Sequence, residues 1–483
     1  MMSAKRDTTG RLQLAALLIL CVAAFLLGGG SRADIASLIF LRPISFAILA
    51  FALWQAKRGS WRSAGVPFWL VLAIFVLALA QLVPLPPSVS EALPGRELQQ
   101  SVLAAAGMAD QWRPLTLSPS RTTNALLSLG VPLAALALCS LSRPIPRRVI
   151  VWTLLAGGLA TSVLSLGQLL GPRDGPLYFY RLTNEGLPVG LFANRNHNAI
   201  FLAALLPLAA WIGLFGSASV GRGNSTFRQV GAVGFILFAF AIILLSGSRN
   251  GAVLACIAAG AIALLSLLER SANLTSDKGA LGKKVVRWHR FAPLLFLGGF
   301  AGIAIAAYLT SRSLAFDRFA GDSFDTSLRA ALLPYLADLA VAYFPAGSGF
   351  GTFYQVYQVI EPTELLQPAY VNQAHNDPLQ FVIEGGLAGI AILLAGIGWF
   401  AVQGWRCFSE FRLQVRTRDH IDPALFAWLS LAFLLAASIF EYPLRVPSLM
   451  LVASMLTVVI CNGGRGRAIR RRIDQGMVSE RPH

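Results

Sequence analysis

Long runs of apolar residues recur along the whole chain, and each is long enough to cross about 30 Å of hydrocarbon as an α-helix. Hydrophobic residues make up 55% of the 483 residues and charged residues only 13%, which argues against a soluble protein with a single large core. The expected fold class is all-α, a polytopic helical membrane protein. We expect about twelve transmembrane helices. Their approximate cores are 12–28, 35–55, 67–84, 122–141, 149–170, 197–216, 229–246, 250–268, 291–310, 379–402, 423–441 and 447–462.

Basic residues indicate how these spans are oriented. They gather in alternate loops, which places both termini in the cytoplasm by the positive-inside rule. These loops carry Lys57, Arg58 and Arg62; Arg143, Arg147 and Arg148; Arg222 and Arg228; Lys283, Lys284, Arg287 and Arg290; and Arg406, Arg412, Arg416 and Arg418. Anionic lipid headgroups, and not nucleic acid, are therefore the expected partner of the net charge of +17. The first apolar run resembles a signal peptide, but we expect an uncleaved signal anchor.

This topology divides the chain into four parts. They are the first nine transmembrane helices with a cytoplasmic N-terminus (1–310), a large periplasmic loop (311–378), the last three transmembrane helices (379–462) and a basic cytoplasmic tail (463–483). A loop as long as 311–378 should have structure of its own. Its sequence predicts an amphipathic helix over about 325–343, a flexible turn at 347–352 and a short helix over 353–360.

The stretch 372–378, Asn-Gln-Ala-His-Asn-Asp-Pro, lies between this loop and the next apolar run. Asp377 followed by Pro378 predicts an N-cap and a proline at the first helical position. The helix should then continue through the apolar residues to about Phe400. His375 would lie just outside a membrane helix, at its positive dipole end. An imidazole in this position could take a proton from a hydroxyl group.

Three arginines join His375 as candidate functional residues. Arg195, Arg249 and Arg445 come from separate loops, yet the topology places them on the same membrane face as His375. Arg249 lies in a turn of about five residues between two apolar spans, where a charge is costly unless it meets protein, water or an anion. The guanidinium group offers phosphate a planar fork of donors and a permanent charge. Arg195 and Arg249 could therefore clamp a diphosphate.

Each candidate also has a purely structural alternative. Arg195 could extend to lipid headgroups, and Arg249 could pair with an acidic residue of the large loop. His197 could cap or line the start of its helix. Arg445 is close enough in sequence to Glu441 for the two to pair, and for them a structural role is favoured. His375 by itself could be an ordinary loop histidine.

No metal or cofactor is expected. The five cysteines form no CxxC pair and fall in apolar runs or near basic loops, which is typical of small packing residues. No cluster of histidine, cysteine, aspartate and glutamate has metal-ligand spacing. The glycines at 347, 349 and 351 follow no predicted strand, so they are expected to form a turn and not a nucleotide loop. Glu384 is expected to be a buried hydrogen-bonding residue more than a catalytic one.

Four motifs follow one another in a characteristic order. They are Gly190-Leu191-Phe192-Ala193-Asn194-Arg195-Asn196-His197-Asn198; Ser246-Gly247-Ser248-Arg249-Asn250-Gly251; Gly347-Ser348-Gly349-Phe350-Gly351-Thr352-Phe353; and His375-Asn376-Asp377 with Glu384-Gly385-Gly386. This ordered set resembles the bacterial O-antigen ligase family, which also contains O-antigen and exopolysaccharide polymerases. The segment Trp112-Arg113-Pro114-Leu115-Thr116 is similar to an upstream loop of the family. The resemblance covers about residues 70–460.

The resemblance implies a GT-C-type membrane glycosyltransferase. Such an enzyme would use an undecaprenyl-diphosphate-linked glycan at the periplasmic face of the bacterial inner membrane, by inversion and without a metal. The essential arginines of the family match Arg195 and Arg249, and its essential histidine matches His375. The residues that we expect to contribute to substrate binding are Arg195, Arg249, Asn196, His197, Asn376 and Arg445.

Several activities remain open at this point. An O-antigen ligase, which moves a whole glycan onto lipid A–core, ranks first. A polymerase, which moves the glycan onto another lipid-linked repeat unit, ranks second, and a protein O-oligosaccharyltransferase third. A polysaccharide or lipid transporter is the alternative from another class, because about twelve helices with both ends inside is a common transporter plan. The sequence shows no inverted repeat, and its notable polar residues gather at one membrane face, which disfavours a transporter.

Overall fold

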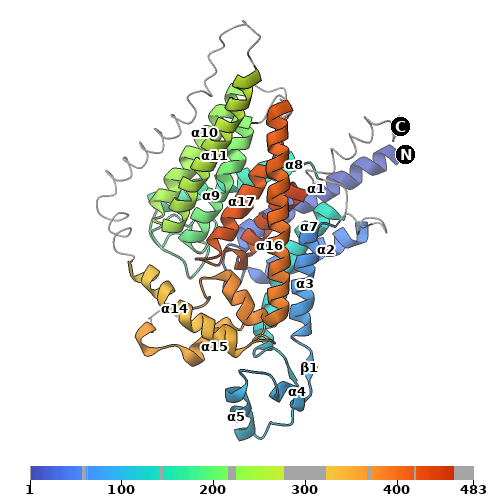
Figure 1. Cartoon of the computed structure of the whole chain (residues 1–483), viewed down its shortest axis with the longest axis vertical. Helices are drawn as coiled ribbons and strands as arrows, with labels where there is room; N and C mark the ends of the chain where they lie inside the picture. Colours follow the sequence, from blue (N-terminus) through green and yellow to red (C-terminus); the bar gives the residue numbers. More distant parts are fainter. Residues whose placement is uncertain are drawn as a thin grey trace. The chain divides into compact units, whose positions relative to one another are not determined.

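The computed structural model describes residues 2–56, 61, 64–141, 145–215, 225–276, 323–366, 371–417 and 420–461 (Figure 1). The chain forms two compact units, and each is described by itself. Unit 1 comprises Met1–Arg143, Ala320–Trp399 and Leu435–Leu451, and unit 2 comprises Pro144–Phe319, Phe400–Leu434 and Val452–His483. Several expectations lie outside the described residues: the span 291–310, the tail 463–483, the basic loop at 283–290, and Lys57, Arg58, Arg62, Arg143, Arg222 and Arg418.

The expected fold class is confirmed. Within the described residues, eight helices are long and apolar enough to cross a membrane, and four shorter apolar helices accompany them. Every expected span that falls within those residues coincides with helix. The apolar runs therefore identified the helices correctly, since a backbone in hydrocarbon must satisfy its own hydrogen bonds. The division of the chain at residues 310, 378 and 462 stays a prediction.

The N-terminal part of unit 1 is a cluster of packed helices. They are α1 (Met2–Leu27), α2 (Leu38–Gln55), α3 (Val66–Ala80), α6 (Pro119–Ser128) and α7 (Gly130–Ser140). α7 packs against α1, α2 and α3. The span expected at 122–141 is thus two helices, α6 and α7, that meet at Gly130. A Cβ atom on Gly130 would lie 2.7 Å from Oγ of Ser45 on α2, so the small residue permits this close packing.

The loop between α3 and α6 is ordered around a short antiparallel ribbon. β1 (Pro84–Leu85) pairs with β2 (Arg113–Pro114), and α4 (Pro87–Glu91) and α5 (Glu97–Ala105) lie between them in the sequence. β2 belongs to the upstream segment 112–116 that the sequence singled out. The ribbon brings this segment back to the end of α3, where the Thr116 N–H donates to the Gln81 carbonyl at 3.0 Å.

Both helices expected within the loop 311–378 are present. α14 (Ser323–Ala342) and α15 (Phe353–Ile360) lie side by side in Figure 1 and are followed by the 3-10 turn η5 (Thr363–Leu365). They share an apolar core that includes Leu336, Phe353, Tyr357 and Ile383. The turn expected to be flexible at 347–352 is buried, and its Thr352 hydroxyl donates to Ser348 Oγ at 2.7 Å. This part of the chain is therefore packed against the start of the next helix, α16.

α16 (Asp377–Thr417) is not one continuous helix as the run 379–402 predicted, because it breaks at Gly386. Gly386 has φ 56° and ψ −146°, a conformation open almost only to glycine. The chain at 345–349 satisfies the backbone groups that the break leaves unpaired. Leu387 N–H donates to the Pro345 carbonyl at 2.8 Å, and the carbonyls of Ile383 and Glu384 accept from Ser348 and Gly349 N–H at 3.0 Å each. The break is thus supported by the protein around it, because Leu387 N–H and the carbonyls of Ile383 and Glu384 find partners in the chain at 345–349.

Gly386→Ala is expected to destabilise the protein by about 1–3 kcal/mol from backbone conformation alone. A Cβ atom would also lie 2.2 Å from the Pro345 carbonyl oxygen, which is backbone and cannot rotate away. The matched control is Gly398→Ala in the same helix, where a Cβ atom meets nothing within 4 Å and helix propensity improves. Thermal unfolding of the detergent-solubilised protein measures both. Equal unfolding temperatures in the two variants would contradict the close contact at the break.

Unit 2 is built around α9. Its helices are α8 (Arg147–Leu170), α9 (Arg195–Ala210), the π-helical turn η2 (Trp211–Phe215), α10 (Ser225–Leu245) and α11 (Arg249–Ser276). α16, α17 (Ala424–Ala437) and α18 (Pro447–Cys461) each have residues in both units. α8, α10 and α11 all pack on α9, and every residue of α9 from His197 to Ala210 is buried. α9 is therefore the core helix of this unit. The positions of its N-terminal residues are set by protein contacts and not by lipid.

Candidate active site

His375 occupies a strained loop directly before α16. Its φ of 50° makes it the one non-glycine residue with positive φ among the described residues. Such a backbone persists only where the surroundings hold it, and it is frequent at functional sites. Gln380, on the first turn of α16, supplies part of that hold. Its Oε1 accepts from Ala374 N–H at 2.8 Å, and its Nε2 donates to Gln373 Oε1 at 2.7 Å.

The imidazole of His375 faces a buried carboxylate. Nδ1 lies 3.3 Å from Oε2 of Glu441, close enough for an ion pair when the imidazole is protonated. The Glu441 side chain is fully buried, whereas 22% of the His375 side chain remains exposed. Tyr442 packs edge-on against the imidazole, with ring centroids 4.8 Å apart. One edge of the imidazole is thus fixed by protein, and the ring keeps an accessible part for a substrate.

Asn376, not Asp377, caps α16. The Asn376 side-chain oxygen accepts from Leu379 N–H at 3.0 Å, which is the geometry of an N-cap residue with the third helical position. Asp377 is therefore the first helical residue and Pro378 the second, so the helix begins one residue earlier than predicted. The capping contact gives Asn376 a structural role, and its expected part in substrate binding stays a prediction.

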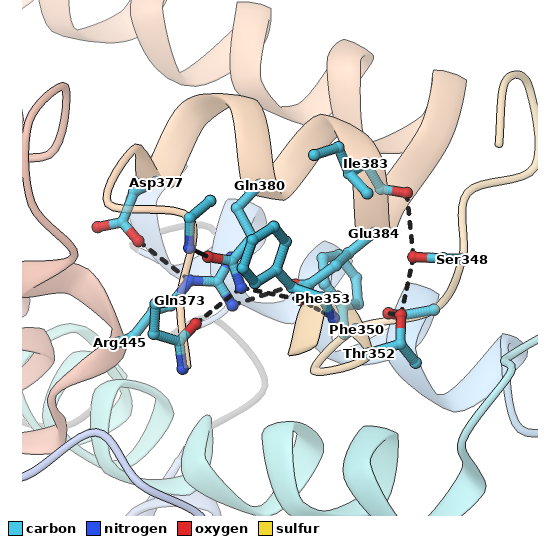
Figure 2. A network of polar contacts seen from close by, with 12 residues as sticks. Ser348, Phe350, Thr352, Phe353, Gln373, Asp377, Gln380, Ile383, Glu384 and Arg445 are labelled. Atoms are coloured by element: carbon cyan, nitrogen blue, oxygen red, sulfur yellow. Dashed lines mark hydrogen bonds and ion pairs between the residues drawn. The ribbon is translucent and has the colours of Figure 1, made fainter. Parts of the chain in front are cut away.

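Asp377 instead takes part in a buried ion network (Figure 2). Arg445, in the 3-10 turn η6 (Pro443–Arg445), donates from Nε to Asp377 Oδ1 at 3.0 Å and from Nη1 to Glu384 Oε2 at 3.1 Å. The Glu384 side chain is fully buried, the Asp377 side chain is 9% exposed and the Arg445 side chain 19%. Burial lowers the pKa of Arg445, but the charges of Glu384 and Asp377 raise it by more, so its pKa lies above the usual value.

This network corrects one expectation and confirms another. Arg445 was expected to pair with Glu441, but its ion pairs are with Asp377 and Glu384, while Glu441 lies against His375. The buried hydrogen-bonding role expected for Glu384 is confirmed, because its Oε1 accepts from Phe353 N–H and from Gln380 Nε2 at 3.2 and 3.0 Å. Both carboxylates hold the Arg445 guanidinium, which gives Arg445 a structural role, and its expected part in substrate binding stays a prediction.

Arg195 lies at the start of α9 in unit 2. Asn194 caps this helix by accepting from Asn196 N–H at 2.8 Å, so Arg195 is its first helical residue. The Arg195 guanidinium reaches across to the turn before α11, where Nη1 donates to the Ser246 carbonyl at 3.4 Å. Arg195 and Asn196 are partly exposed, whereas His197 is buried. The burial of His197 agrees with its lining the helix start.

Arg249 is the first residue of α11, and this helix starts beside α9. Ser248 caps α11 by accepting from Gly251 N–H at 3.2 Å. A Cβ atom on Gly251 would lie 2.4 Å from Cβ of Ala199, so glycine allows the two helices to touch close to their starts. The contact of Arg195 with Ser246 shows that both arginines lie at the same end of the α9–α11 pair. Two helix N-termini and two guanidinium groups make this end of the pair suited to an anion.

A polar cluster inside the spans holds the loop before α9. Asn198 accepts from the Thr161 hydroxyl at 2.8 Å and donates to Ser165 Oγ at 2.9 Å, and all three residues are buried. Gln168 on the same helix, α8, accepts from Gly190 N–H and donates to the Gly190 carbonyl. The motif that begins at Gly190 is thus fastened to α8 by side chains. This attachment fixes the chain that leads into Arg195.

The structure therefore places the expected site residues in two groups. His375, Asn376 and Arg445 belong to unit 1, and the residues at the helix starts of unit 2 are Arg195, Asn196, His197 and Arg249. Sequence reasoning missed the contact of Glu441 with His375. The only signal in the sequence was Glu441 itself, an acidic residue in the turn before the last span. We expected it to pair with its close sequence neighbour, Arg445. The described residues contain no group of three or more histidine, cysteine, aspartate or glutamate side chains that could hold a metal ion. The expected metal independence stays a prediction.

Comparison with protein families identifies a domain in the chain. Residues 234–394 match the family model described as O-antigen ligase (Wzy_C). The match includes Arg249, α14, α15, the strained loop at His375 and the break at Gly386. Arg195 and the segment that contains Glu441 and Arg445 lie outside it. No curated protein matches the chain.

Proposed function

Because residues 234–394 form an O-antigen ligase domain, we propose that this membrane protein transfers a lipid-diphosphate-linked glycan to the hydroxyl group of an acceptor. The match supports a glycosyltransferase of the O-antigen ligase/polymerase type. The proposal goes further in naming undecaprenyl diphosphate as the lipid, lipid A–core as the acceptor and the periplasmic face of the inner membrane as the place of reaction. The observation that carries it is His375, which lies within the matched domain, is strained and partly exposed, and has the buried carboxylate of Glu441 3.3 Å from its Nδ1.

In the proposed reaction His375 is the general base. Nδ1 faces Glu441, so Nε2 is the nitrogen that takes the proton from the acceptor hydroxyl as its oxygen attacks the anomeric carbon. The bond from that carbon to the diphosphate breaks, and undecaprenyl diphosphate leaves. Attack opposite the leaving group inverts the anomeric centre. The Glu441 carboxylate, 3.3 Å from Nδ1, occupies the place of the carboxylate that orients a catalytic histidine.

Arg195 and Arg249 bind the diphosphate in this proposal. Negative charge grows on the leaving diphosphate as the glycosidic bond breaks, and fixed cations stabilise it without reorganising. The support is their place at two neighbouring helix starts, with partly exposed side chains. Asn196, His197 and Asn376 lie beside these residues in the sequence, and their part in substrate binding belongs to the proposal.

Arg249→Lys is expected to lower transfer by about 100-fold, because lysine keeps the charge but loses the planar fork that fits a phosphate. The matched control is Arg173→Lys, an exposed arginine in the loop that leads to α9. Both variants are expressed in a deletion strain of the native host, and surface polysaccharide is compared on gels at equal protein level. Polysaccharide of normal amount and length with Arg249→Lys would show that the assignment of this arginine is wrong.

The gel pattern of the deletion strain identifies which acceptor the protein uses. Free core with long lipid-linked chains is the result expected for a ligase, and core that carries single repeats is the result for a polymerase. If neither pattern is seen and acceptor proteins carry the glycan, the activity is that of a protein O-oligosaccharyltransferase. A transporter is excluded if the purified protein transfers glycan in detergent without any gradient.

A further inference from the structure

We propose that Glu384 is a positioning residue for His375 and acts through Arg445 and Asp377 and through Gln380. The inference rests on the proposed function, because it gives Glu384 a part in the reaction of His375. Glu384 touches neither substrate nor reacting atoms in this assignment. Glu384 sets the position of His375, which does.

Glu384 joins three separate parts of unit 1. Its Oε1 accepts from the N–H of Phe353, the first residue of α15, at 3.2 Å, and from Gln380 Nε2 at 3.0 Å. Its Oε2 accepts from Arg445 Nη1 at 3.1 Å. Figure 2 shows Glu384 pointing from α16 toward Phe353 and Arg445. The side chain is fully buried, so water does not compete for these contacts.

One path leads from Glu384 to the carboxylate behind His375. Arg445 holds Asp377, which also accepts from Leu444 N–H at 3.2 Å, and the Asp377 N–H donates to the Ser438 carbonyl at 2.8 Å. The segment 438–445 is therefore tied at both its ends to the first residue of α16. Glu441 lies in the middle of this segment, and His375 lies two residues before Asp377. The ties thus fix the distance between the Glu441 carboxylate and the imidazole.

A second path leads to the backbone of His375. The side-chain nitrogen of Gln380 donates to both Glu384 and Gln373, and its side-chain oxygen accepts from Ala374 N–H. Glu384 orients Gln380, and Gln380 holds the two residues that precede His375. The φ of 50° at His375 needs such support, because a non-glycine residue leaves this conformation when it is free to do so.

Because α16 breaks at Gly386, this network determines the direction of residues 377–385. Residues 377–385 are separated from the rest of α16 by the break, so the continuing membrane helix does not set their direction. Their contacts with residues 348 and 349, with α15 and with 438–445 set it instead. Loss of the charge on Glu384 therefore releases His375 without unfolding the membrane spans.

Glu384→Gln is the variant that tests this. Glutamine keeps the size and can still accept from Phe353, but it loses the charge that faces Arg445. The triad of Asp377, Arg445 and Glu384 then has one cation and one anion, so the variant is expected to fold. Purified protein in detergent is assayed for transfer from a lipid-diphosphate-linked glycan, with initial rates measured over a range of donor concentrations. We expect kcat to fall about 10- to 100-fold, as for a misplaced catalytic group, with the KM for donor within about 2-fold.

Three further variants make the result decisive. Glu364→Gln, at an exposed glutamate, is the matched control and should keep the wild-type kcat. Asp377→Asn removes the other carboxylate of the triad and should also lower kcat, which covers the case that Glu384→Gln does not fold. Wild-type kcat per folded molecule in both triad variants would overturn the inference, and so would a donor KM that rises while kcat stays. His375→Ala separates this from the proposed function, since an active His375→Ala variant refutes the base assignment itself.

Discussion

Replacing His375 with alanine is expected to reduce glycan transfer by about 10²–10⁴-fold, the usual loss when a general base is removed. The imidazole is partly exposed, and its Nδ1 lies 3.3 Å from Oε2 of the buried Glu441. Without it, the acceptor hydroxyl attacks with its proton still bound. Initial rates of the purified protein at saturating donor and acceptor measure the effect directly.

His420→Ala is the matched control for this experiment. His420 is exposed and lies in unit 2, outside the proposed machinery, so its removal should leave the rate within about 2-fold. The unfolding temperature of His375→Ala should stay close to that of the wild type, because alanine also carries a Cβ atom and meets the same backbone strain at this φ of 50°. Transfer at the wild-type rate by His375→Ala would assign the base to another residue.

Arg445→Met is expected to have the largest effect on stability, a loss of about 3–5 kcal/mol. The variant removes the cation from between two buried carboxylates, and each then lacks an ion-pair partner. Leu444 N–H and Gln380 Nε2 remain as hydrogen-bond donors to Asp377 and Glu384, but neutral donors do not balance two charges. Thermal unfolding in detergent and the half-life at a fixed temperature both report the loss.

Two comparisons show whether the loss arises from the charges. Arg412→Met, at an exposed arginine of α16, should change the unfolding temperature little, since exposed charges contribute little to stability. Adding Glu384→Gln to Arg445→Met should recover part of the loss, because one of the two unpaired carboxylates is then neutral. If the double variant is less stable than Arg445→Met alone, the ion network is not the reason for the instability.

The apolar runs and the helix signals of the sequence predicted local structure well. The helix expected over 353–360 coincides with α15, and the one expected over 325–343 differs from α14 by a few residues. The polar stretch before α16 was also recognised as a helix start. These features depend on residues within one or two turns of each other, so periodicity and capping chemistry are visible in the chain itself.

The partners of the buried charges could not be predicted in the same way. Arg445 had Glu441 as its near neighbour, but it pairs with Asp377 and Glu384, which lie 68 and 61 residues away. Glu441 faces His375 instead. An ion pair is selected by distance and burial in the folded chain, and sequence separation says nothing about either.

By itself, the sequence determined that this is a multi-span helical membrane protein, that it resembles the O-antigen ligase family, and that His375, Arg195 and Arg249 are its candidate functional residues. Only the tertiary structure decided that α16 breaks at Gly386, that 345–349 pairs with the broken turn, and that a buried carboxylate stands behind the imidazole. The physical reason is the range of the forces. Hydrophobic length and capping act along the chain, whereas an unpaired backbone group or a buried charge must find its partner in space.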